Sequence, residues 1–474
     1  MKTKTKLWAL FLACMMLIVL LPGSVLAVGS TNVSINGLNL ESGRIYKYGE
    51  GTVLFDSATN TLVLENATIE EGGDTPVPVL GISGDLTIEI KGNNTITSLE
   101  KRPIFIGLYT DGTANVTFKG SGEDKLTIVT NGDALQADGG NITIDGCTVN
   151  ITSNNWGGIS AYELNNSSGL VGGNLTIQNH ANVTVNTYTE ALYADKVVTI
   201  SDSNVTLNTF ASSLVGANGI NVSDSTVAAT STGDKYNALY SAFGTINISN
   251  SAVEAYTIYD YSYPAIWGNT VSISNNSNIL ADSNGDSAIY SVVECNILDS
   301  DLKVEGYYDA ICSKGAININ NGKVEASSND ESACGLYAVN KISISGSPDI
   351  IAYGGIDAEE IAITPNAGEK LEVKVGDRAN GDAGATHFKD SPYAESVTFT
   401  VDDDLWKNTY AHIKPYAHVE EPTLPTCAGD KDKNCDGVVT CDEEKGAGWT
   451  WNNTLKVCEY TGGKDYIVVN TSAK

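Results

Sequence analysis

Positively charged residues are scarce in this sequence. Its 474 residues include 28 lysines and arginines against 57 aspartates and glutamates, and the formal net charge at pH 7 is −29. A chain of this charge is repelled by nucleic acids and anionic lipids, and it attracts divalent cations. The composition therefore excludes nucleic acid as a partner. It leaves two interpretations of the acidic surface open, namely cation binding and the solubility of an exported protein.

Long apolar segments are also scarce. The one continuous apolar run, from Leu7 to Leu21, follows three lysines and precedes Pro22 and the small residue Ala27. This order is typical of a secretory signal peptide, and the run is short for a transmembrane span. We expect residues 1–27 to be a signal peptide that is cleaved after Ala27. The mature protein is then expected to be secreted, extracellular or associated with the cell surface, without membrane insertion.

The rest of the sequence is dominated by a repeat. A phrase of small residue, Leu or Ile, any residue and small residue recurs every 20 to 33 residues from Gly81 to Ala358. Two phrases with alternating apolar and polar residues follow it, as in residues 142–144 and 149–151. Three short strands of period two per repeat are typical of one coil of a parallel β-helix. We therefore predict an all-β, right-handed parallel β-helix of about 12 coils with three strands per coil.

The predicted division of the chain follows from where the repeat begins and ends. The helix needs a cap at each end, and a proline-bearing linker precedes a small cysteine-bearing tail. The expected parts are a signal peptide over 1–27, an N-terminal β cap over 28–78, the β-helix over 79–365, a C-terminal β cap over 366–420, and a linker with a tail module over 421–474.

One turn position of the repeat holds only glycine, asparagine or aspartate. It lies two residues after the last apolar position of the second strand, in ten successive coils. These residue types tolerate left-handed backbone angles, so the pattern predicts the same strained corner in every coil. The residues are Gly120, Gly146, Asn179, Asp202, Asp224, Asn250, Asn275, Asp299, Asn321 and Gly346.

The tail contains a segment that fits the calcium-loop template. Acidic or amide side chains stand at loop positions one, three and five, Gly437 stands at position six, and a glutamate stands at position twelve. The expected cofactor is Ca²⁺, and the alternative is an acidic turn without metal. The module resembles the single calcium loops of dockerin and excalibur-type extracellular domains. The expected ligands are Asp432, Asn434, Asp436, Val438 through its carbonyl, Thr440 and Glu443.

Four cysteines lie in the same tail. In an exported chain two disulfides are the expected state, and three pairings are open. A zinc site is the weaker interpretation, because the spacings do not form paired C-x-x-C motifs. The four are Cys427, Cys435, Cys441 and Cys458.

Aromatic residues recur at the variable position of the first phrase. Strand alternation turns this position outward, and three of the aromatics fall on successive coils. Such a ladder is suited to stacking on the C–H faces of sugars, whereas the alternative is that the rings stack on one another. Acidic residues beside the phrase are candidates for additional calcium: Asp133, Asp138, Glu190, Asp195, Asp286 and Asp309. The candidate carbohydrate-binding residues are Tyr193, Tyr240, Trp267, Tyr290 and Tyr337, and Tyr109 holds the same position in an earlier coil.

Catalytic residues of known β-helix enzymes are missing from the coils. Pectate lyases use an arginine or lysine base beside calcium-binding aspartates, but this chain has only Arg44, Arg102 and Arg378. The histidine and arginine–lysine motifs of polygalacturonases are absent, and His180, the only histidine of the coils, is expected in a solvated turn. No pair of carboxylates stands out for acid–base work. We lean against an enzyme, and a polysaccharide lyase or hydrolase stays open.

Residues 132–146 and the opening segment 49–66 resemble a family of bacterial secreted β-helix proteins, usually described as carbohydrate-binding domain-containing proteins. The resemblance implies a pectate-lyase-like fold without clear catalysis and calcium-linked binding of plant or other extracellular polysaccharide. The expected function is therefore that of a secreted, non-catalytic carbohydrate-binding protein. A surface adhesin or structural rod with a cell-surface partner is the third hypothesis.

Overall fold

The computed structural model describes residues 31–71, 78–99, 114–162, 172–388, 397–400, 407–416, 449–452 and 457–460. The chain divides into one unit that ends at Pro415 and a second that begins at Tyr416. The expected signal peptide and the calcium loop of residues 432–443 lie outside the described residues, as does Tyr109. In the described parts, no helix is both long enough and apolar enough to cross a membrane.

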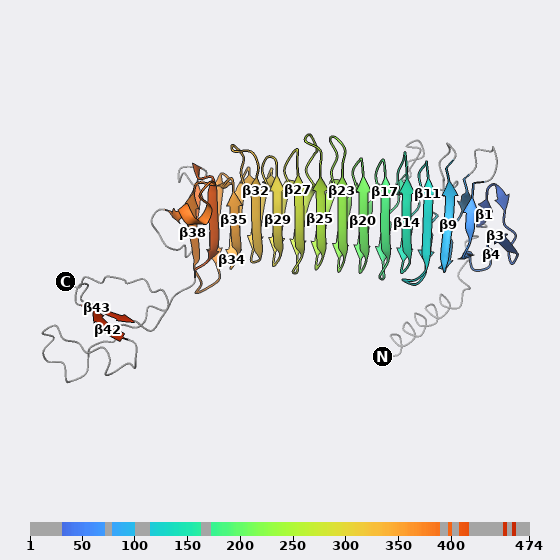
Figure 1. Ribbon diagram of the computed structural model, residues 1–474, viewed down its shortest axis with the longest axis horizontal. Helices are drawn as coiled ribbons and strands as arrows, with labels where there is room; N and C mark the ends of the chain where they lie inside the picture. The colour runs from blue at the N-terminus through green and yellow to red at the C-terminus, as the bar shows by residue number, and fades with distance from the viewer. Residues whose placement is uncertain are drawn as a thin grey trace, which may run out of the picture. The chain divides into compact units, whose positions relative to one another are not determined.

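The predicted parallel β-helix is confirmed. Strands account for 61% of the residues that the structure describes, and they wind into a parallel solenoid of about 11 turns (Figure 1). In a typical turn, β12 (Leu135–Asp138), β13 (Ile142–Asp145) and β14 (Thr148–Ser153) follow one another, and each pairs in parallel with the matching strand of the next turn.

The third strands of the turns form one wall of the solenoid. They make a 15-stranded sheet that ends with three strands of the C-terminal cap. Its members are β6 (Thr68–Glu70), β9 (Asn93–Ser98), β11 (Lys125–Thr130), β14, β17 (Asn182–Thr187), β20 (Asn204–Thr209), β23 (Thr226–Ser231), β25 (Ala252–Thr257), β27 (Asn278–Ser283), β29 (Asp301–Gly306), β32 (Lys323–Ser328), β35 (Asp349–Tyr353), β41 (Tyr410–Pro415), β38 (Leu371–Gly376) and β39 (Thr386–His387).

The first and second strands form a second hydrogen-bonded sheet, because three strands run continuously around the corner between them. These three are β24 (Leu239–Ser249), β26 (Ile266–Ser274) and β28 (Ile289–Leu298). The other first strands are β15 (Ile159–Tyr162), β18 (Leu192–Ala194), β21 (Leu214–Gly216), β30 (Ile311–Ser313), β33 (Leu336–Ala338) and β36 (Ile356–Asp357). The other second strands are β8 (Leu86–Lys91), β10 (Val116–Lys119), β16 (Leu175–Gln178), β19 (Val197–Ser201), β22 (Gly219–Ser223), β31 (Ala316–Asn320), β34 (Lys341–Gly346) and β37 (Glu360–Pro365).

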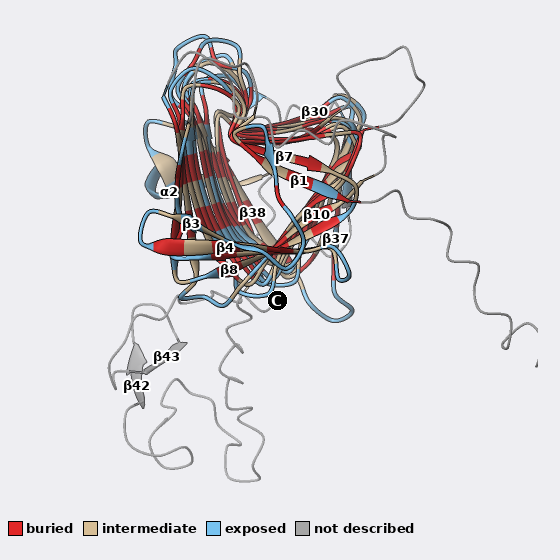
Figure 2. Ribbon diagram, turned by 90° about the vertical axis from the view of Figure 1, so that its right-hand side faces the viewer, coloured by how far each residue is buried: buried red, intermediate tan, exposed pale blue. Residues whose placement is uncertain are grey.

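The core is built from like residues stacked in register. Ile144 lies opposite Ile177, which lies opposite Ile200, and all three are fully buried. The view along the solenoid shows buried and intermediate residues in its walls and exposed residues mainly at the turns (Figure 2). Burial of each such side chain contributes about 1.5–3 kcal/mol. Because each coil covers its neighbour, a single coil has no core of its own.

Antiparallel strands stand at both ends of the solenoid. At the N-terminal end, β1 (Asn32–Ile35) pairs with β2 (Leu38–Asn39) and with β7 (Leu80–Ser83), and β3 (Ile45–Tyr48), β4 (Gly51–Asp56) and β5 (Thr61–Glu65) form a meander. At the other end, β41 pairs with β35 and β38, and β40 (Val397–Thr400) pairs with β37. These strands occupy sheet edges that are otherwise open to pairing with another chain. The short helix α2 (Gly381–Gly384) follows β38.

The predicted left-handed corner is confirmed at all of its positions except Gly120. Asn179, Asp202 and Asn250, for example, have φ values of 60°, 48° and 47°. The side chains also bond from coil to coil, and the Asn250 Nδ2 donates to the Asp224 Oδ1 at 2.6 Å. Gly120 differs because five residues separate β10 from β11, so the longer turn distributes the bend over more residues.

A ladder of buried serines follows this corner and was not predicted. The backbone N–H of Ser225 donates to the Oγ of Ser251, whose own N–H donates to the Oγ of Ser277 in the next coil. Ser203 and Ser300 extend the same pattern at the two ends. Each serine hydroxyl in turn donates to a carbonyl two or three residues before it. The ladder therefore satisfies amides that the corner removes from the sheet.

The second unit contains the antiparallel pair β42 (Trp449–Asn452) and β43 (Val457–Tyr460). Cys458 lies in β43, whereas the other three cysteines of the predicted disulfides lie outside the described residues. The cysteines described in the solenoid are free thiols: Cys147, Cys295, Cys312 and Cys334.

Candidate functional site

The aromatic ladder predicted from the first phrase is present on three successive coils. Tyr240 lies opposite Trp267, which lies opposite Tyr290. The ring centroids are 4.8 and 6.1 Å apart, with interplanar angles of 22° and 7°. Each face of the Trp267 ring thus meets a neighbouring ring, and the Lys314 Nζ lies 6.0 Å from the centroid of Tyr290. This geometry favours the interpretation that the rings stack on one another, because mainly their edges are left for a ligand.

The other predicted aromatics stand apart from this stack. The Tyr193 hydroxyl donates to the Asp195 Oδ1 at 2.9 Å, and its ring meets Tyr162 edge-on at 6.0 Å. Burial, and then the bond to Asp195, raise the pKa of Tyr193. Tyr337 lies opposite Cys312 in the register of β30 and β33. The five predicted residues thus occupy one register column, in which Val215 separates Tyr193 from the three stacked rings and Cys312 separates Tyr337 from them.

The acidic residues beside the first phrase are engaged with the backbone. Burial raises the pKa of Asp133, Asp286 and Asp309, and one carboxylate oxygen of each accepts a backbone N–H. The donors are the amides of Gly157, Ser287 and Cys334, at 2.9, 2.7 and 2.8 Å. Within the part of the chain that the structure describes, no three His, Cys, Asp or Glu side chains gather in a way that could hold a metal ion. The predicted calcium edge is therefore not formed there.

His180 lies in the turn after Asn179, as expected. It is 83% exposed, and its Nδ1 is 3.0 Å from the Asp202 Oδ1. This pair belongs to the ladder of corner residues, and His180 has a positive φ of 62° in the turn.

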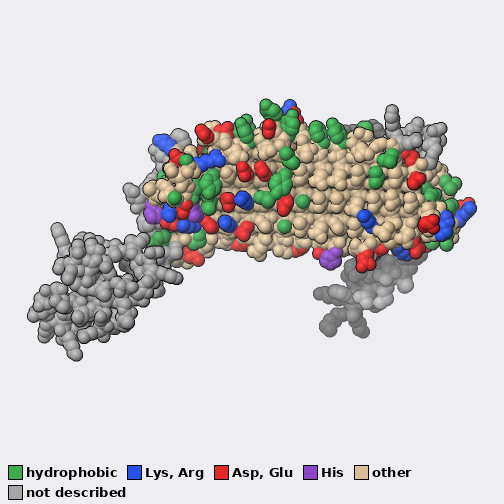
Figure 3. Space-filling view, viewed as in Figure 1, with side chains coloured by type: hydrophobic (Ala, Val, Ile, Leu, Met, Phe, Trp, Pro, Cys, Tyr) green, Lys and Arg blue, Asp and Glu red, His purple; other side chains and the backbone are tan. Residues whose placement is uncertain are grey.

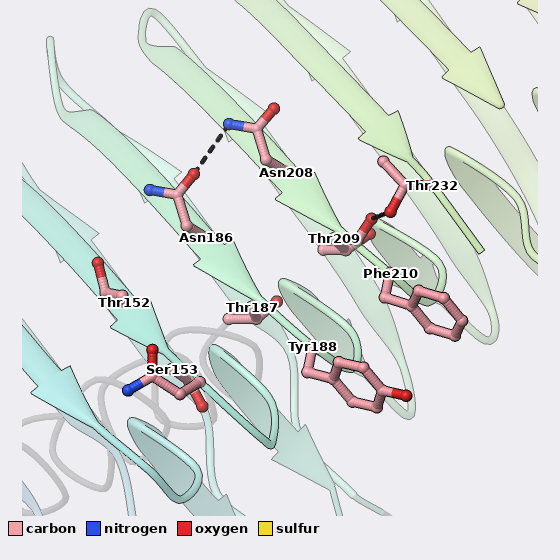
Figure 4. Close-up of a pocket in the computed structure, with 10 residues that line it drawn as sticks. Thr152, Ser153, Asn186, Thr187, Tyr188, Asn208, Thr209, Phe210 and Thr232 are labelled. Carbon is pink, nitrogen blue, oxygen red and sulfur yellow. Dashed lines mark hydrogen bonds between the residues drawn. The ribbon is translucent and has the colours of Figure 1, made fainter. Parts of the chain in front are cut away.

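A groove that the sequence did not reveal lies where β14, β17 and β20 end. Its volume is about 380 Å³, and Figure 4 shows its residues projecting from successive strands. The lining residues are threonine, serine, asparagine and two aromatics, without a carboxylate or a basic group. The groove is shallow and open to solvent, so a ligand would lie along it and would not be enclosed by it.

Two asparagines from adjacent strands form the polar side of the groove. Asn186 and Asn208 lie opposite each other in the register, and the Asn208 Nδ2 donates to the Asn186 Oδ1 at 2.9 Å (Figure 4). The remaining groups, the Asn186 amine and the Asn208 carbonyl, have no hydrogen-bond partner among the described residues. The free donor lies on the β14 side of the pair, where Asn186 is opposite Thr152, and the free acceptor lies on the β23 side, where Asn208 is opposite Thr230 (Figure 4).

Two aromatic rings form the other side. Tyr188 and Phe210 are the first residues after β17 and β20, and their ring centroids are 4.9 Å apart at an interplanar angle of 2°. They remain 51% and 39% exposed. Tyr236 meets Phe210 edge-on at 6.1 Å, so the free face of the pair is that of Tyr188. The groove therefore combines an apolar ring face with amide and hydroxyl groups.

Further exposed aromatics continue along the edge of the solenoid at which these strands end. Figure 3 shows hydrophobic side chains along this upper edge. A sequence signal exists, because an aromatic directly follows the threonine that ends β17 and β20. The further exposed aromatics along this edge are Trp156, Tyr259, Tyr261, Tyr263, Tyr307 and Tyr308.

No family model, no curated protein and no solved structure matches this chain.

Proposed function

We propose that this protein is a secreted, non-catalytic carbohydrate-binding protein and that an extracellular polysaccharide binds in the groove at the ends of β14, β17 and β20. The observation that carries the proposal is the lining of the groove. Its lining combines the ring of Tyr188, which is 51% exposed, with the amides of Asn186 and Asn208.

This combination matches the two kinds of surface that a sugar ring presents. The C–H faces of a sugar stack on an aromatic ring, and its neighbouring hydroxyls both donate and accept hydrogen bonds. The Asn186 amide NH2 group can donate a hydrogen bond to a sugar hydroxyl, and the Asn208 amide oxygen can accept one. Their mutual bond at 2.9 Å holds both amides in place before a ligand arrives, which reduces the entropy lost on binding.

The lining also supports binding over catalysis at this site. Glycoside hydrolysis by general acid–base chemistry needs two carboxyl groups that flank the reacting bond. The groove lining contains neither aspartate nor glutamate, and it contains no lysine, arginine or histidine. A lyase or hydrolase activity therefore has no candidate residues in the groove.

Calcium is part of the proposal through the tail module. The support is the match of residues 432–443 to the calcium-loop template, with Glu443 as the bidentate ligand. Titration of the mature chain with Ca²⁺ by calorimetry tests this point. Binding of one ion that Glu443→Gln weakens is the expected result, and equal heats for both chains contradict it.

The polysaccharide itself is tested with the mature chain from Val28 onward. Retention on a panel of soluble and insoluble glycans, with and without a chelator, is compared for wild type and Tyr188→Ala. The loss of one ring face predicts a decrease in affinity of about tenfold. Phe243→Ala is the matched control, because Phe243 is 77% exposed in β24 and lies outside the groove. Failure to bind any glycan, or equal retention of Tyr188→Ala and wild type, refutes the proposal.

A further inference from the structure

Charge is unevenly distributed on the outer face of the 15-stranded sheet. On β14, β17, β20 and β23, every outward position holds threonine or asparagine apart from Ala228. The outward residues of the next strands include Glu254 on β25, Asp282 on β27, and Lys303 with Glu305 on β29. Figure 3 shows an expanse without charged side chains beside a region of red and blue ones. In a chain with 57 acidic residues, this uncharged area is not explained by composition.

We refer to the outward residues of β14, β17, β20 and β23 as the polar face. Thr184 on β17 lies opposite Thr206 on β20, and Thr206 lies opposite Ala228 on β23. Neighbouring strands are about 4.8 Å apart, and residues on one face of a strand recur about every 6.8 Å. The polar face is therefore a flat lattice of hydroxyl and amide groups.

The polar face and the groove are one continuous surface. Thr152, Asn186 and Asn208 belong to both, because they are the last outward residues of their strands. A ligand that enters the groove thus lies against the polar face if it continues along the strands. The ligand of the groove is therefore the molecule expected to cover the polar face.

The charge of the surface decides between polysaccharide classes. A charged group that loses water against a face without a counter-charge is costly to bury. An acidic polysaccharide would bring carboxylates to such a face on a chain of net charge −29. An uncharged polysaccharide carries no such cost, and its hydroxyls match the hydroxyls and amides of the lattice.

We infer that the polar face is a second carbohydrate-contacting surface and that its ligand is an uncharged polysaccharide presented as a flat, insoluble surface, bound without calcium at this face. The inference rests on the proposed function, because it extends the groove to a larger contact. It assigns to the outer face of the sheet a preference for uncharged over acidic polysaccharides, which the groove alone does not supply.

The experiment places two carboxylates at the centre of the polar face. The double variant Thr184→Glu, Thr206→Glu is compared with wild type for depletion onto microcrystalline cellulose and chitin, and for binding to soluble polygalacturonate. The control Asn278→Glu, Ser327→Glu adds the same two charges to outward positions of the same sheet on β27 and β32. Wild type and control are expected to bind the insoluble neutral glycans with or without chelator, and the face variant is expected to lose at least tenfold in affinity.

Several results overturn the inference. One is equal retention of the face variant and wild type, and another is a wild-type preference for polygalacturonate. A wild-type dimer that the face variant converts to a monomer assigns the polar face to a second copy instead. If the glutamates prevent folding, Thr184→Val with Thr206→Val removes the hydroxyls and keeps β-branched residues of the same shape. Retention of this folded variant at the wild-type level also overturns the inference.

The variant Tyr188→Ala separates this inference from the proposed function. If Tyr188→Ala loses glycan and the face variants do not, the groove binds carbohydrate and the polar face does not. If wild type binds no glycan at all, the proposed function fails as well.

Discussion

The buried serine ladder allows a quantitative test of how the coils are held together. Ser251 is 5% exposed, its Oγ accepts the N–H of Ser225 at 3.1 Å, and it donates to the carbonyl of Ser249 at 2.7 Å. Replacement by alanine leaves the Ser225 N–H without a partner at a buried corner. The Ser249 carbonyl keeps a second bond, from the N–H of Asp224 at 3.2 Å. The Ser225 N–H therefore loses its hydrogen bond altogether, whereas the Ser249 carbonyl loses one of two.

The magnitude follows from this difference. An unsatisfied buried donor costs about 1–3 kcal/mol, and the loss of one net hydrogen bond at a carbonyl that stays paired costs about 1 kcal/mol. We expect Ser251→Ala to lower the free energy of unfolding by about 2–4 kcal/mol. The alanine itself fits, because it removes one atom and adds none.

The assay is urea unfolding of the mature chain followed by far-ultraviolet circular dichroism, with the midpoint shift converted through the slope of the transition. Ser272→Ala is the control, because Ser272 points outward from β26 and its hydroxyl has no hydrogen bond among the described residues. That control should stay within about 0.5 kcal/mol of wild type. Hydrogen exchange at the Ser225 amide should accelerate in Ser251→Ala. Equal stabilities of the two variants would refute the reasoning.

Three further predictions concern other parts of the solenoid. Asn250 has a φ of 47°, so Asn250→Gly should be tolerated, whereas Asn250→Val should lose about 1–2 kcal/mol in the same urea assay. The hydrogen bond from His412 lowers the pKa of Asp382, so its stabilisation is present above about pH 4 and is lost as the pH falls through the lowered value. His412→Gln should therefore be less stable than wild type at pH 6, and the difference should shrink at pH 3. Trp267→Ala should lower stability by about 2 kcal/mol through its two ring contacts and leave glycan retention unchanged; a loss of retention with intact stability would restore the ladder as a binding site.

The fold was predictable from the sequence because a solenoid repeats its local rules. The alternation in residues 142–144 and the corner at Asn179 each recur in many coils, so one interpretation is checked many times along the chain. The exception at Gly120 arose where a single turn is longer than the others. Its sequence satisfied the residue preference, but the preference does not specify turn length.

The serine ladder escaped prediction for a different reason. A serine after Asp224 or Asn250 is an ordinary turn residue when read singly. Its role depends on a hydrogen bond to the next coil, and that contact exists only once the coils are stacked. The repetition of the serine in successive coils was the available signal.

The sequence predicted that aromatic rings contact the ligand, but it did not predict which rings are available for that contact. Outward aromatics were expected to face a ligand, but Tyr240, Trp267 and Tyr290 occupy the same register position in successive strands and therefore meet one another. The exposed rings of Tyr188 and Phe210 stand just past the strand ends. Alternation within a strand says nothing of residues beyond it.

This contrast indicates where function is to be sought on a parallel β-helix. Stacking brings like residues together, so a column of identical side chains tends to satisfy itself, as the asparagine pairs and the ring stack do. A ligand must instead be met by groups that stacking leaves unsatisfied, or at a boundary where the residues of a column change. Both conditions hold at the polar face: the outer amide groups of the Asn186 and Asn208 pair are free, and the column changes from uncharged to charged between β23 and β25, where Glu254 lies opposite Ala228. The variant Thr184→Glu, Thr206→Glu moves this boundary into the polar face. If its preference among polysaccharides changes while the fold is kept, the residue type of the column, and not the fold, sets the specificity for the glycan.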